Sequence, residues 1–367
     1  MKKLISIILF VVLSLGTWAQ RTEIKIPDIP NFVTLKCDFH MHSVFSDGSV
    51  WPTVRVEEAW RDGLDAIALT EHIEYRPHSQ DITSDHNRSY EIALPVAKQK
   101  GILLVKAAEI TRAMPPGHLN VLFTKNNNLL ERENVLDALK EAKEQGAFFI
   151  WNHPGWKAQQ PDTIKWYDMH TQLYDNGMMH GVEIFNEKEY YPEVFQWALD
   201  KQLTIFANSD VHSPIDMTYI NGEKRPITLV FAKNKSLKSL KQAMFKHQTA
   251  TYFNGKIMGD SKWLKPIFKR SIKVMNHPVG VRNNISTEVH IHNSSELDYH
   301  LESTKPGIGI DYPNKLVLKA GKTTSFTISG NSVGIGNVPN LTLFYTVKNL
   351  WIKPDENLSV EIKVRNL

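Results

Sequence analysis

Histidine and acidic residues recur in short clusters along this chain, and imidazole and carboxylate groups are typical ligands of transition metals. The first cluster lies in the segment Asp38-Phe-His-Met-His-Ser-Val-Phe-Ser-Asp-Gly48. In an extended segment, His40 and His42 point to the same face, where two imidazoles can bind one ion. Asp47 follows in a Ser-Asp-Gly turn, from which its carboxylate can reach the same place. The segment therefore predicts a metal site, provided that further ligands converge on it.

Further candidate ligands follow short apolar runs at intervals along the chain. They are His72 in Thr70-Glu-His, Glu109, His118 in Gly117-His-Leu, His153 in Asn152-His-Pro, and Asp210 and His212 in Ser209-Asp-Val-His. Functional groups of a β/α barrel gather at the carboxyl ends of its strands. The positions of these residues therefore predict one metal-binding rim.

The apolar runs have the length of β-strands and alternate with amphipathic helical stretches. Strands are expected at Thr34–Phe39, Ala66–Thr70, Leu103–Ala108, Leu119–Phe123, Ala147–Trp151, Val182–Phe185, Leu203–Ala207 and Ile227–Phe231. Helices are expected at Thr53–Asp62, Asn134–Gln145, Thr163–Asp175, Pro192–Lys201 and Ser236–Lys246. This repetition predicts parallel βαβ units, in a barrel or an open sheet. Ala68 shares a face with His72, as Ala107 does with Glu109, which favours an enclosed barrel interior.

The sequence pattern changes after Trp263-Leu-Lys-Pro266, where helical periodicity gives way to strict alternation. Leu341, Leu343 and Tyr345 show this alternation, and turn residues separate the alternating runs. Such a series of short strands predicts a small β-sandwich. We therefore divide the chain into a segment 1–19, a barrel domain 20–262 and an all-β sandwich domain 266–367.

Residues 1–19 have the pattern of a secretory signal. Lys2 and Lys3 precede the apolar run Leu4–Leu15, and Thr17-Trp-Ala19 fits a small-x-small cleavage site. The apolar run is shorter than the roughly 20 residues that span a bilayer. We expect an exported protein, periplasmic or secreted, without a membrane anchor once the signal is removed.

Composition limits the partners and the covalent chemistry of the chain. The net charge of +4 over 367 residues includes no basic block, which argues against nucleic acid as a partner. Cys37 is the only cysteine, so no internal disulfide can form. Its place in an apolar strand predicts a buried, inert thiol, with metal binding or an intermolecular bridge as alternatives.

The histidine and acidic motifs resemble, in order, those of the PHP (polymerase and histidinol phosphatase) family. The resemblance covers about residues 34–255 and rests on His40-x-His42, the Ser46-Asp-Gly turn, Thr70-Glu-His72, Ala108-Glu109, Gly117-His118, Asn152-His-Pro154 and Ser209-Asp-x-His212. The segment from Glu109 to His118, the signal and the C-terminal β-domain together resemble a secreted phosphodiesterase branch. The resemblance implies an α/β fold, a distorted (β/α)7 TIM-like barrel, here followed by the all-β sandwich.

The resemblance also implies a trinuclear metal site. The first ion would be bound by His40, His42, Glu109 and Asp210, and Glu109 would bridge to a second ion bound by His118 and His153. The third ion would be bound by Asp47, His72 and His212. Ligands of this kind, without thiolate, suit Zn, Mn or Fe and do not distinguish among them. Up to three divalent transition-metal ions are therefore the expected cofactors.

The charge of such a site indicates the substrate. Three divalent ions carry +6 against −3 from Asp47, Glu109 and Asp210, and this surplus favours phosphate esters over neutral substrates. We expect an enzyme, a phosphoesterase that hydrolyses small-molecule monoesters or diesters with hydroxide activated by the trinuclear site. Two alternatives stay open: an amidohydrolase-like hydrolase of C–N or C–O bonds, and an inactive barrel that serves as a binding protein. The sequence does not reveal the oligomeric state.

Two basic residues are candidates for substrate binding. Arg112 is expected either to bind a phosphate oxygen through its forked guanidinium or to be a solvated loop residue. Lys157 lies in a loop that can reach the rim. Glu109, Arg112 and Asp210 are the candidate catalytic residues.

Other residues have two competing interpretations each. Asp38 either orients an imidazole from behind or forms hydrogen bonds at a strand end, and Asn186 and Asn208 are candidate supporting donors. The stretches around Trp151, Trp156 and Trp166 either line a wall for the substrate's organic group or pack in the core. His290-Ile-His292 repeats the opening motif, but its alternation with apolar residues predicts imidazoles that face solvent on the β-domain.

Overall fold

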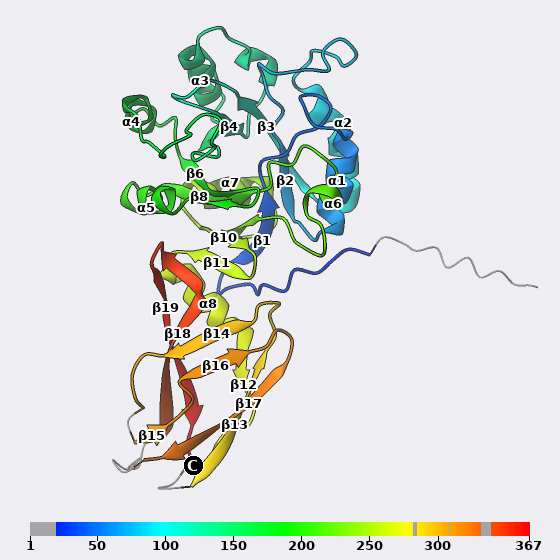
Figure 1. Ribbon diagram of the computed structural model, residues 1–367. Helices are drawn as coiled ribbons and strands as arrows, with labels where there is room; N and C mark the ends of the chain where they lie inside the picture. The colour runs from blue at the N-terminus through cyan, green and yellow to red at the C-terminus, as the bar shows by residue number, and fades with distance from the viewer. Residues whose placement is uncertain (1–19, 282–284, 308, 332–338) are drawn as a thin grey trace, which may run out of the picture.

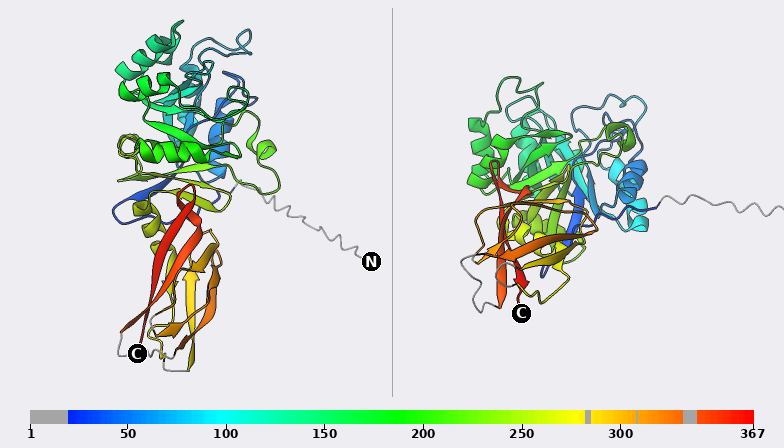
Figure 2. Two further views of the ribbon diagram at one scale, coloured as in Figure 1. Left: turned by 60° about the vertical axis from the view of Figure 1, so that its left-hand side comes forward. Right: turned by 60° about the horizontal axis from the view of Figure 1, so that its bottom comes forward.

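The computed structural model describes residues 20–281, 285–307, 309–331 and 339–367, which form two parts (Figure 1). The first part is an α/β barrel and the second is an all-β sandwich that extends from one end of the barrel (Figure 2). The predicted signal at residues 1–19 lies outside the described residues. That prediction therefore stays a prediction.

Eight of the strands build the barrel wall, and each coincides with one of the expected apolar runs. They are β1 (Val33–Asp38), β2 (Ala66–Leu69), β3 (Leu103–Ile110), β4 (Leu119–Leu122), β5 (Phe148–Trp151), β6 (Gly181–Asn186), β8 (Thr204–Asn208) and β9 (Ile227–Ala232). They pair in the order β9-β1-β2-β3-β4-β5-β6-β8. Next to this wall, β7 (Glu189–Tyr190) pairs with β6, and β10 (Thr249–Phe253) and β11 (Lys256–Gly259) continue the sheet beyond β9. The predicted α/β barrel is confirmed.

The expected parallel pairing holds within two groups of strands and fails between them. β1, β2 and β3 are parallel, as are β5, β6 and β8. β4 runs antiparallel to both β3 and β5, and β9 is antiparallel to β1. The connection 111–118 between β3 and β4 is too short for the crossover that parallel strands need. As a result β4 begins at the same rim where β3 ends.

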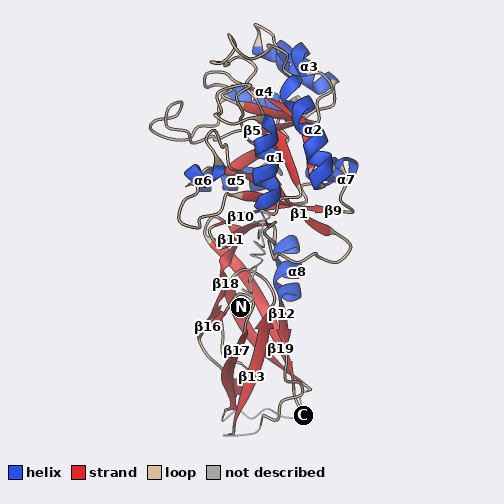
Figure 3. Ribbon diagram, turned by 90° about the vertical axis from the view of Figure 1, so that its right-hand side faces the viewer, coloured by secondary structure: helices blue, strands red, loops and turns tan. Residues whose placement is uncertain are grey.

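Helices cover the outside of the barrel (Figure 3). They are α1 (Pro52–Arg61), α2 (Arg88–Lys100), α3 (Val135–Glu144), α4 (Asp168–Asp175), α5 (Pro192–Asp200), α6 (Ile215–Thr218) and α7 (Leu237–Phe245), with a short 3₁₀ turn at Asn127–Leu130. Helices α2 and α6 were not among the expected helices, and α2 contains Pro95, a residue that usually ends a helix. Helix α4 begins at Asp168 rather than at Thr163. Within the described residues, no helix combines the length and apolarity needed to cross a bilayer.

The interior of the barrel is filled by small and apolar side chains. Ala66, Ala68, Val105 and Ala107 belong to one buried cluster, as the alternation along β2 and β3 predicts. Cys37 lies in the same cluster and is a free, buried cysteine. Burial raises the pKa of its thiol well above the ordinary value, which keeps the thiol protonated and unreactive.

The C-terminal part is a sandwich of two antiparallel layers, as predicted. One layer contains β12 (Ile272–Val274), β13 (Ser286–Asn293), β15 (Ile310–Asp311) and β17 (Thr323–Gly330); the other contains β14 (Tyr299–Ser303), β16 (Lys315–Leu318), β18 (Asn340–Lys353) and β19 (Glu356–Arg365). Leu341, Leu343 and Tyr345 point into the core between the layers. His290 and His292 alternate with buried residues of β13. The His290 ring contacts the Ser325 hydroxyl and the exposed Glu288, and the His292 ring contacts the Thr323 hydroxyl.

Helix α8 (Ser261–Ser271) connects the two parts, and the predicted boundary at 262–266 falls inside it. The expectation that helical structure stops near Pro266 is therefore wrong, because this proline is accommodated within the helix. Strand β11 of the barrel pairs with β18 of the sandwich, so hydrogen bonds of one sheet cross the junction. Glu296 of the sandwich also accepts a hydrogen bond from the Tyr252 hydroxyl at 2.7 Å.

Candidate metal centre

The nine predicted ligands lie together at one rim of the barrel. His40, His42 and Asp47 follow β1, His72 follows β2, Glu109 is in β3, His118 precedes β4, His153 follows β5, and Asp210 and His212 follow β8. The reversed direction of β4 explains why His118 reaches this rim from the start of its strand. Four overlapping groups of these side chains have ligand atoms within 4.8 Å of one another.

Glu109 is the hub of the cluster and is completely buried. Its Oε2 lies 3.3 Å from Nε2 of both His40 and His42 and 3.2 Å from His72 Nδ1. Its Oε1 lies 2.7 Å from His118 Nδ1. A single carboxylate therefore borders most of the imidazoles, which is the arrangement that a bridging ligand requires.

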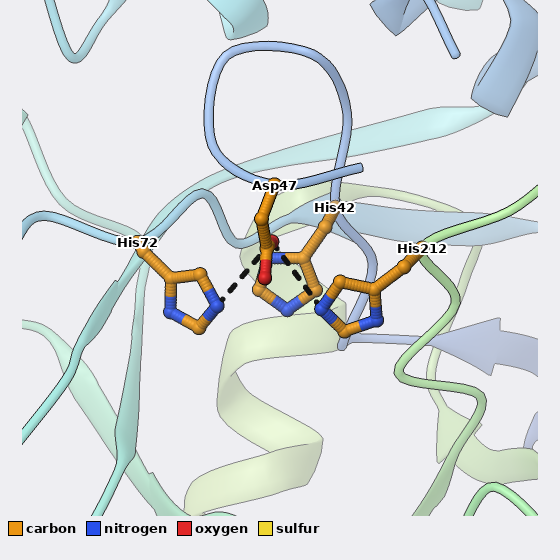
Figure 4. A group of neighbouring side chains, drawn as sticks. All are labelled: His42, Asp47, His72 and His212. Carbon is orange, nitrogen blue, oxygen red and sulfur yellow. Dashed lines mark ion pairs between the residues drawn. The ribbon is translucent and has the colours of Figure 1, made fainter. Parts of the chain in front are cut away.

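Asp47 and three imidazoles form a group on one side of the cluster (Figure 4). Asp47 Oδ1 lies 3.4 Å from His72 Nε2 and 3.3 Å from His212 Nε2. The His42 ring lies between them, with its centroid 4.4 Å from that of His72 and 4.3 Å from that of His212. These side chains point toward one common space, as the implied third metal site requires.

Asp210 completes the opposite side of the cluster. Its Oδ1 lies 3.0 Å from His40 Nε2 and 3.1 Å from His42 Nε2. The backbone of Asp210 has φ of 49°, and that of His153 has φ of 28°. Such values are uncommon for residues other than glycine and cluster at functional sites, where surrounding contacts hold them. Here the Asp210 amide donates to the His40 carbonyl at 2.9 Å.

Several buried polar atoms at the centre of the cluster make no hydrogen bond. They include His42 Nε2, Asp47 Oδ1, Glu109 Oε1 and His118 Nδ1. Each lies 2.7–3.4 Å from an opposing imidazole or carboxylate atom as an ion pair, without hydrogen-bond geometry, so buried ligand atoms face one another across a common space. Divalent ions bound between these imidazole and carboxylate atoms would satisfy them, and the residues present therefore fit the implied metals.

Contacts between imidazoles and carboxylates together determine the pKa shifts in the cluster more than burial does. Burial lowers the pKa of His40, but Asp210 and Glu183 raise it well above its ordinary value. Burial also opposes the charged form of His42, yet the carboxylates of Asp210 and Glu109, 3.1 and 3.3 Å from its Nε2, raise its pKa to about 9. Burial raises the pKa of Glu109, and nearby imidazoles outweigh it and hold that pKa well below the usual range. Without metal, protons on histidine supply the positive charge that the carboxylates need.

Metal binding at pH 7 is expected to release protons. His42, with a pKa of about 9 in the metal-free protein, carries a proton at pH 7, whereas a metal takes the neutral imidazole. Metal affinity therefore falls as the pH falls. Calorimetric titration of the metal-free protein with Mn²⁺ in two buffers of different ionisation enthalpy counts the protons. An apparent enthalpy that is the same in both buffers would contradict this prediction.

Glu183 of β6 is a completely buried carboxylate that the sequence analysis missed. Its Oε1 accepts from His40 Nδ1 at 2.8 Å and from Asn208 Nδ2 at 2.9 Å. Its Oε2 accepts from the His153 amide at 2.7 Å and from Asn186 Nδ2 at 2.9 Å. The carboxylate thus fixes the orientation of His40 and the backbone at His153. The one available signal is a lone acidic residue within the apolar run of β6.

Glu183→Gln is expected to weaken metal binding about 10- to 100-fold, the usual cost of losing a partner behind a metal ligand. All four groups around Glu183 donate hydrogen bonds, so the amide NH₂ of glutamine would face two donors. Metal titration measured by calorimetry checks the affinity, and excess metal should restore most of the turnover. Unchanged affinity would show that Glu183 does not position His40.

Arg55 of α1 holds the loops that carry two of the histidines. This buried guanidinium donates to the carbonyl oxygens of His42 at 2.8 Å, Val211 at 3.1 Å and His212 at 2.8 Å. It also pairs with Glu58 at 2.8 Å. The amphipathic pattern of α1 gives no indication of this role, which depends on two loops that are distant in sequence.

Some of the remaining supporting residues contact the metal-ligand imidazoles, and others form hydrogen bonds at the strand ends. Thr111 Oγ1 lies 2.6 Å from His72 Nδ1, and Ser46 Oγ lies 3.2 Å from His42 Nδ1. Asp38 accepts from Ser209 Oγ at 2.6 Å and from the backbone amide of His40 at 3.4 Å, and it pairs with the buried Arg225 at 3.2 Å. Of its two predicted roles, the structure favours hydrogen bonding at the strand end.

A cavity of about 750 Å³ opens over the cluster. Arg112 lines it and pairs with Glu74 at 2.9 Å, while its buried Nε makes no hydrogen bond. Lys157 is exposed and is not among the residues that line this cavity. The structure therefore brings Arg112 to the mouth and gives Lys157 no contact there.

A solved structure is similar to this chain over nearly its whole length. It is that of a two-domain protein from Bacteroides vulgatus ATCC 8482 that contains a predicted PHP-like metal-dependent phosphoesterase. The two proteins are 47% identical, with a TM-score of 0.88 over 94% of this chain and 99% of the other. This chain belongs to the PHP-like metal-dependent phosphoesterases. The PHP family predicted from the histidine and acidic motifs is thereby confirmed.

Further comparisons concern the second domain and more distant proteins. A family model described as an Ig-like domain matches residues 272–363, which is the sandwich that follows the PHP-like barrel. A putative metal-dependent phosphoesterase from Bifidobacterium adolescentis ATCC 15703 is 16% identical, covering 48% of this chain and 87% of its own, with a TM-score of 0.38. An amidohydrolase from Chromobacterium violaceum is 14% identical over 49% and 88%, also with a TM-score of 0.38. Likeness at this level supports no conclusion, and no curated protein matches the chain.

Proposed function

We propose that this PHP-like phosphoesterase is an exported enzyme that hydrolyses small-molecule phosphate monoesters or diesters with up to three divalent Zn, Mn or Fe ions. The observation that carries the proposal is the group of buried ligand atoms without hydrogen bonds beneath the cavity. The nine side chains around these atoms would bind the ions. When bound, such ions make hydroxide available at neutral pH and offset the charge of phosphate oxygens.

The charge of the ligands supports an anionic substrate. Asp47, Glu109 and Asp210 contribute −3 among the nine side chains, so three divalent ions would leave a net charge of +3. Glu183 lies behind the cluster, where it balances part of this charge without facing the cavity. The open side of the site would therefore favour a phosphoryl group over a neutral ester or amide.

Arg112 is proposed to bind a phosphate oxygen through its guanidinium group, which lines the cavity. Its Nη2 is engaged by Glu74 and by the Arg132 carbonyl, which fixes the guanidinium at the cavity wall. Arg112→Ala is expected to lower turnover about 10²-fold, as for a donor that stabilises transition-state charge, while metal content persists. Arg88→Ala, which removes an exposed arginine from α2, is the control. Kinetics unaltered by Arg112→Ala would remove this residue from the site.

Export is proposed from the pattern of residues 1–19. A matched pair of expression experiments tests it, one with the full chain and one with the chain beginning at Gln20. Amino-terminal sequencing of the protein recovered outside the cytoplasm is expected to start at Gln20. Retention of the full chain inside the cell, with Met1 intact, would contradict export and leave the phosphoesterase proposal standing.

Reconstitution tests the enzymatic proposal. The protein would be purified with Mn, Fe or Zn supplied, its metal content counted, and its activity measured on para-nitrophenyl phosphate and on the bis-ester. We expect metal-dependent release of nitrophenol. Hydrolysis of the bis-ester alone would select a phosphodiesterase, and hydrolysis of carboxylic esters or amides alone would favour an amidohydrolase-like enzyme. Metal binding without activity on any of these compounds would favour a binding protein.

A further inference from the structure

Two exposed aromatic side chains border the metal centre. Tyr75 is 53% exposed and Trp156 is 43% exposed, and both line the cavity. The Tyr75 ring centroid lies 5.9 Å from that of His72, and the Trp156 centroid lies 5.5 Å from His118 and 5.3 Å from His153. A ligand group that leaves the metal centre on this side would contact an aromatic face at once.

The exposure of Trp156 is not shared by the neighbouring tryptophans. Trp151 is completely buried and packs against Trp166, whose centroid is 5.8 Å away, and against Trp197. These residues therefore follow the core-packing interpretation, whereas Trp156 separates from them and lines the cavity.

The Trp156 ring is presented by a fixed turn. The Trp156 amide donates to the His153 carbonyl, and the Trp156 carbonyl accepts from the Gln160 amide, both at 2.9 Å. A Cβ atom at Gly155 would lie 2.4 Å from the Tyr191 ring, so the turn packs closely on that tyrosine. An ordered backbone at this turn lowers the cost of presenting the Trp156 ring to a ligand.

The charges on the cavity wall limit which charged groups a ligand can carry beside an aromatic ring. Beyond the metal ligands, the described residues that line the cavity include the carboxylates Glu187 and Glu189 and a single guanidinium, that of Arg112. The charge of Arg112 is already balanced by Glu74 at 2.9 Å. With Arg112 proposed to bind the phosphoryl group, the described residues that line this wall offer no further Lys or Arg for a second phosphate or carboxylate of a ligand.

We propose that Tyr75 and Trp156 form an aromatic subsite, and that the substrate is a phosphoester whose organic group carries a planar ring and no second anionic group. This inference rests on the proposed function, because it places the phosphoryl group at the metal centre. Stacking of an aromatic ring on these side chains then contributes beyond simple apolar contact.

A matched pair of substrates tests the subsite. The 2-phenylethyl and 2-cyclohexylethyl phosphates have the same kind of leaving group and differ in the planarity of the ring; methyl diesters of both serve if the enzyme cleaves only diesters. We expect kcat/KM to be about three- to tenfold higher for the phenyl compound, mainly through KM. Trp156→Leu and Tyr75→Leu should reduce this ratio. Trp51→Leu, which removes another 43% exposed tryptophan outside the cavity, should leave the ratio unchanged.

Equal kcat/KM for the two compounds with the wild-type enzyme would overturn the subsite, and so would a ratio that Trp156→Leu leaves intact. If the leucine variant does not fold, Trp156→Phe takes its place and should keep a preference for the planar ring. The second anionic group is tested with the 4-carboxyphenyl analogue, which the enzyme should use less well than the phenyl compound. Equal or better use of the carboxylate would contradict that part of the proposal.

Binding separates failure of this inference from failure of the proposed function. The two corresponding phosphonates, which cannot be hydrolysed, would be titrated into the metal-loaded protein and followed by calorimetry. Tighter binding of the phenyl phosphonate supports the subsite even if no phosphate ester is turned over. Turnover of both esters with equal phosphonate affinities would refute the subsite and leave the phosphoesterase proposal intact.

Discussion

Glu109→Gln is expected to lower kcat/KM at least about 10³-fold and to reduce bound metal. The two carboxylate oxygens of Glu109 lie within 3.9 Å of five imidazoles, those of His40, His42, His72, His118 and His153. Glutamine keeps the shape of the side chain but removes the charge and one acceptor at the centre of the cluster. Metal counting on the purified variant and assay with para-nitrophenyl esters measure the two effects.

The control for this variant is Glu288→Gln, which changes an exposed glutamate of β13 in the sandwich. It should retain the metal content and activity of the unaltered protein. The thermal unfolding of both variants shows whether the barrel remains folded. A folded Glu109→Gln protein that binds as much metal and turns over as fast as the control would contradict the role of Glu109 as a bridging ligand.

His42→Ala is expected to remove metal and turnover together. The His42 imidazole belongs to two of the four ligand groups and lies between Asp47 and Asp210. Its removal therefore disturbs two ion positions at once, and we expect a loss of turnover of about 10³-fold or more. Metal analysis and steady-state assay on the same preparation measure the expected joint loss.

The chain offers a matched control for this variant in His290-Ile-His292. This segment repeats the His-x-His spacing, but on β13 it faces away from the sandwich core and contacts Ser325 and Thr323. His292→Ala should leave metal content and turnover unchanged. If His292→Ala reduces them as much as His42→Ala does, the metal centre cannot be confined to the barrel rim.

The positions of the strands and of the ligands along the chain could be predicted because both depend on local patterns. Alternation along β2 and β3 places Ala68 and Ala107 in the barrel interior, and the polar residue that follows each run falls at the rim. His118 fits the same rim although its strand runs the other way, since its motif directly follows a short connection. The meeting of the metal ligands at the strand ends could therefore be predicted from the sequence alone.

The supporting residues could not be predicted in the same way because they depend on neighbours distant in sequence. Glu183 reaches His40 only because β6 pairs with β8 and β5. The role of Arg55 cannot be read from its helix, because it depends on the loops around His42 and His212 that contact its guanidinium. Lys157 is the opposite case, because it is near His153 in sequence but is not among the residues that line the cavity.

Anomalous diffraction from crystals of the Mn-loaded protein locates bound ions without reference to activity. We expect up to three peaks at the barrel rim, bordered by Glu109 and by the groups around Asp47 and Asp210. Mn bound elsewhere, or a fully loaded crystal with no peak among these side chains, would contradict this expectation.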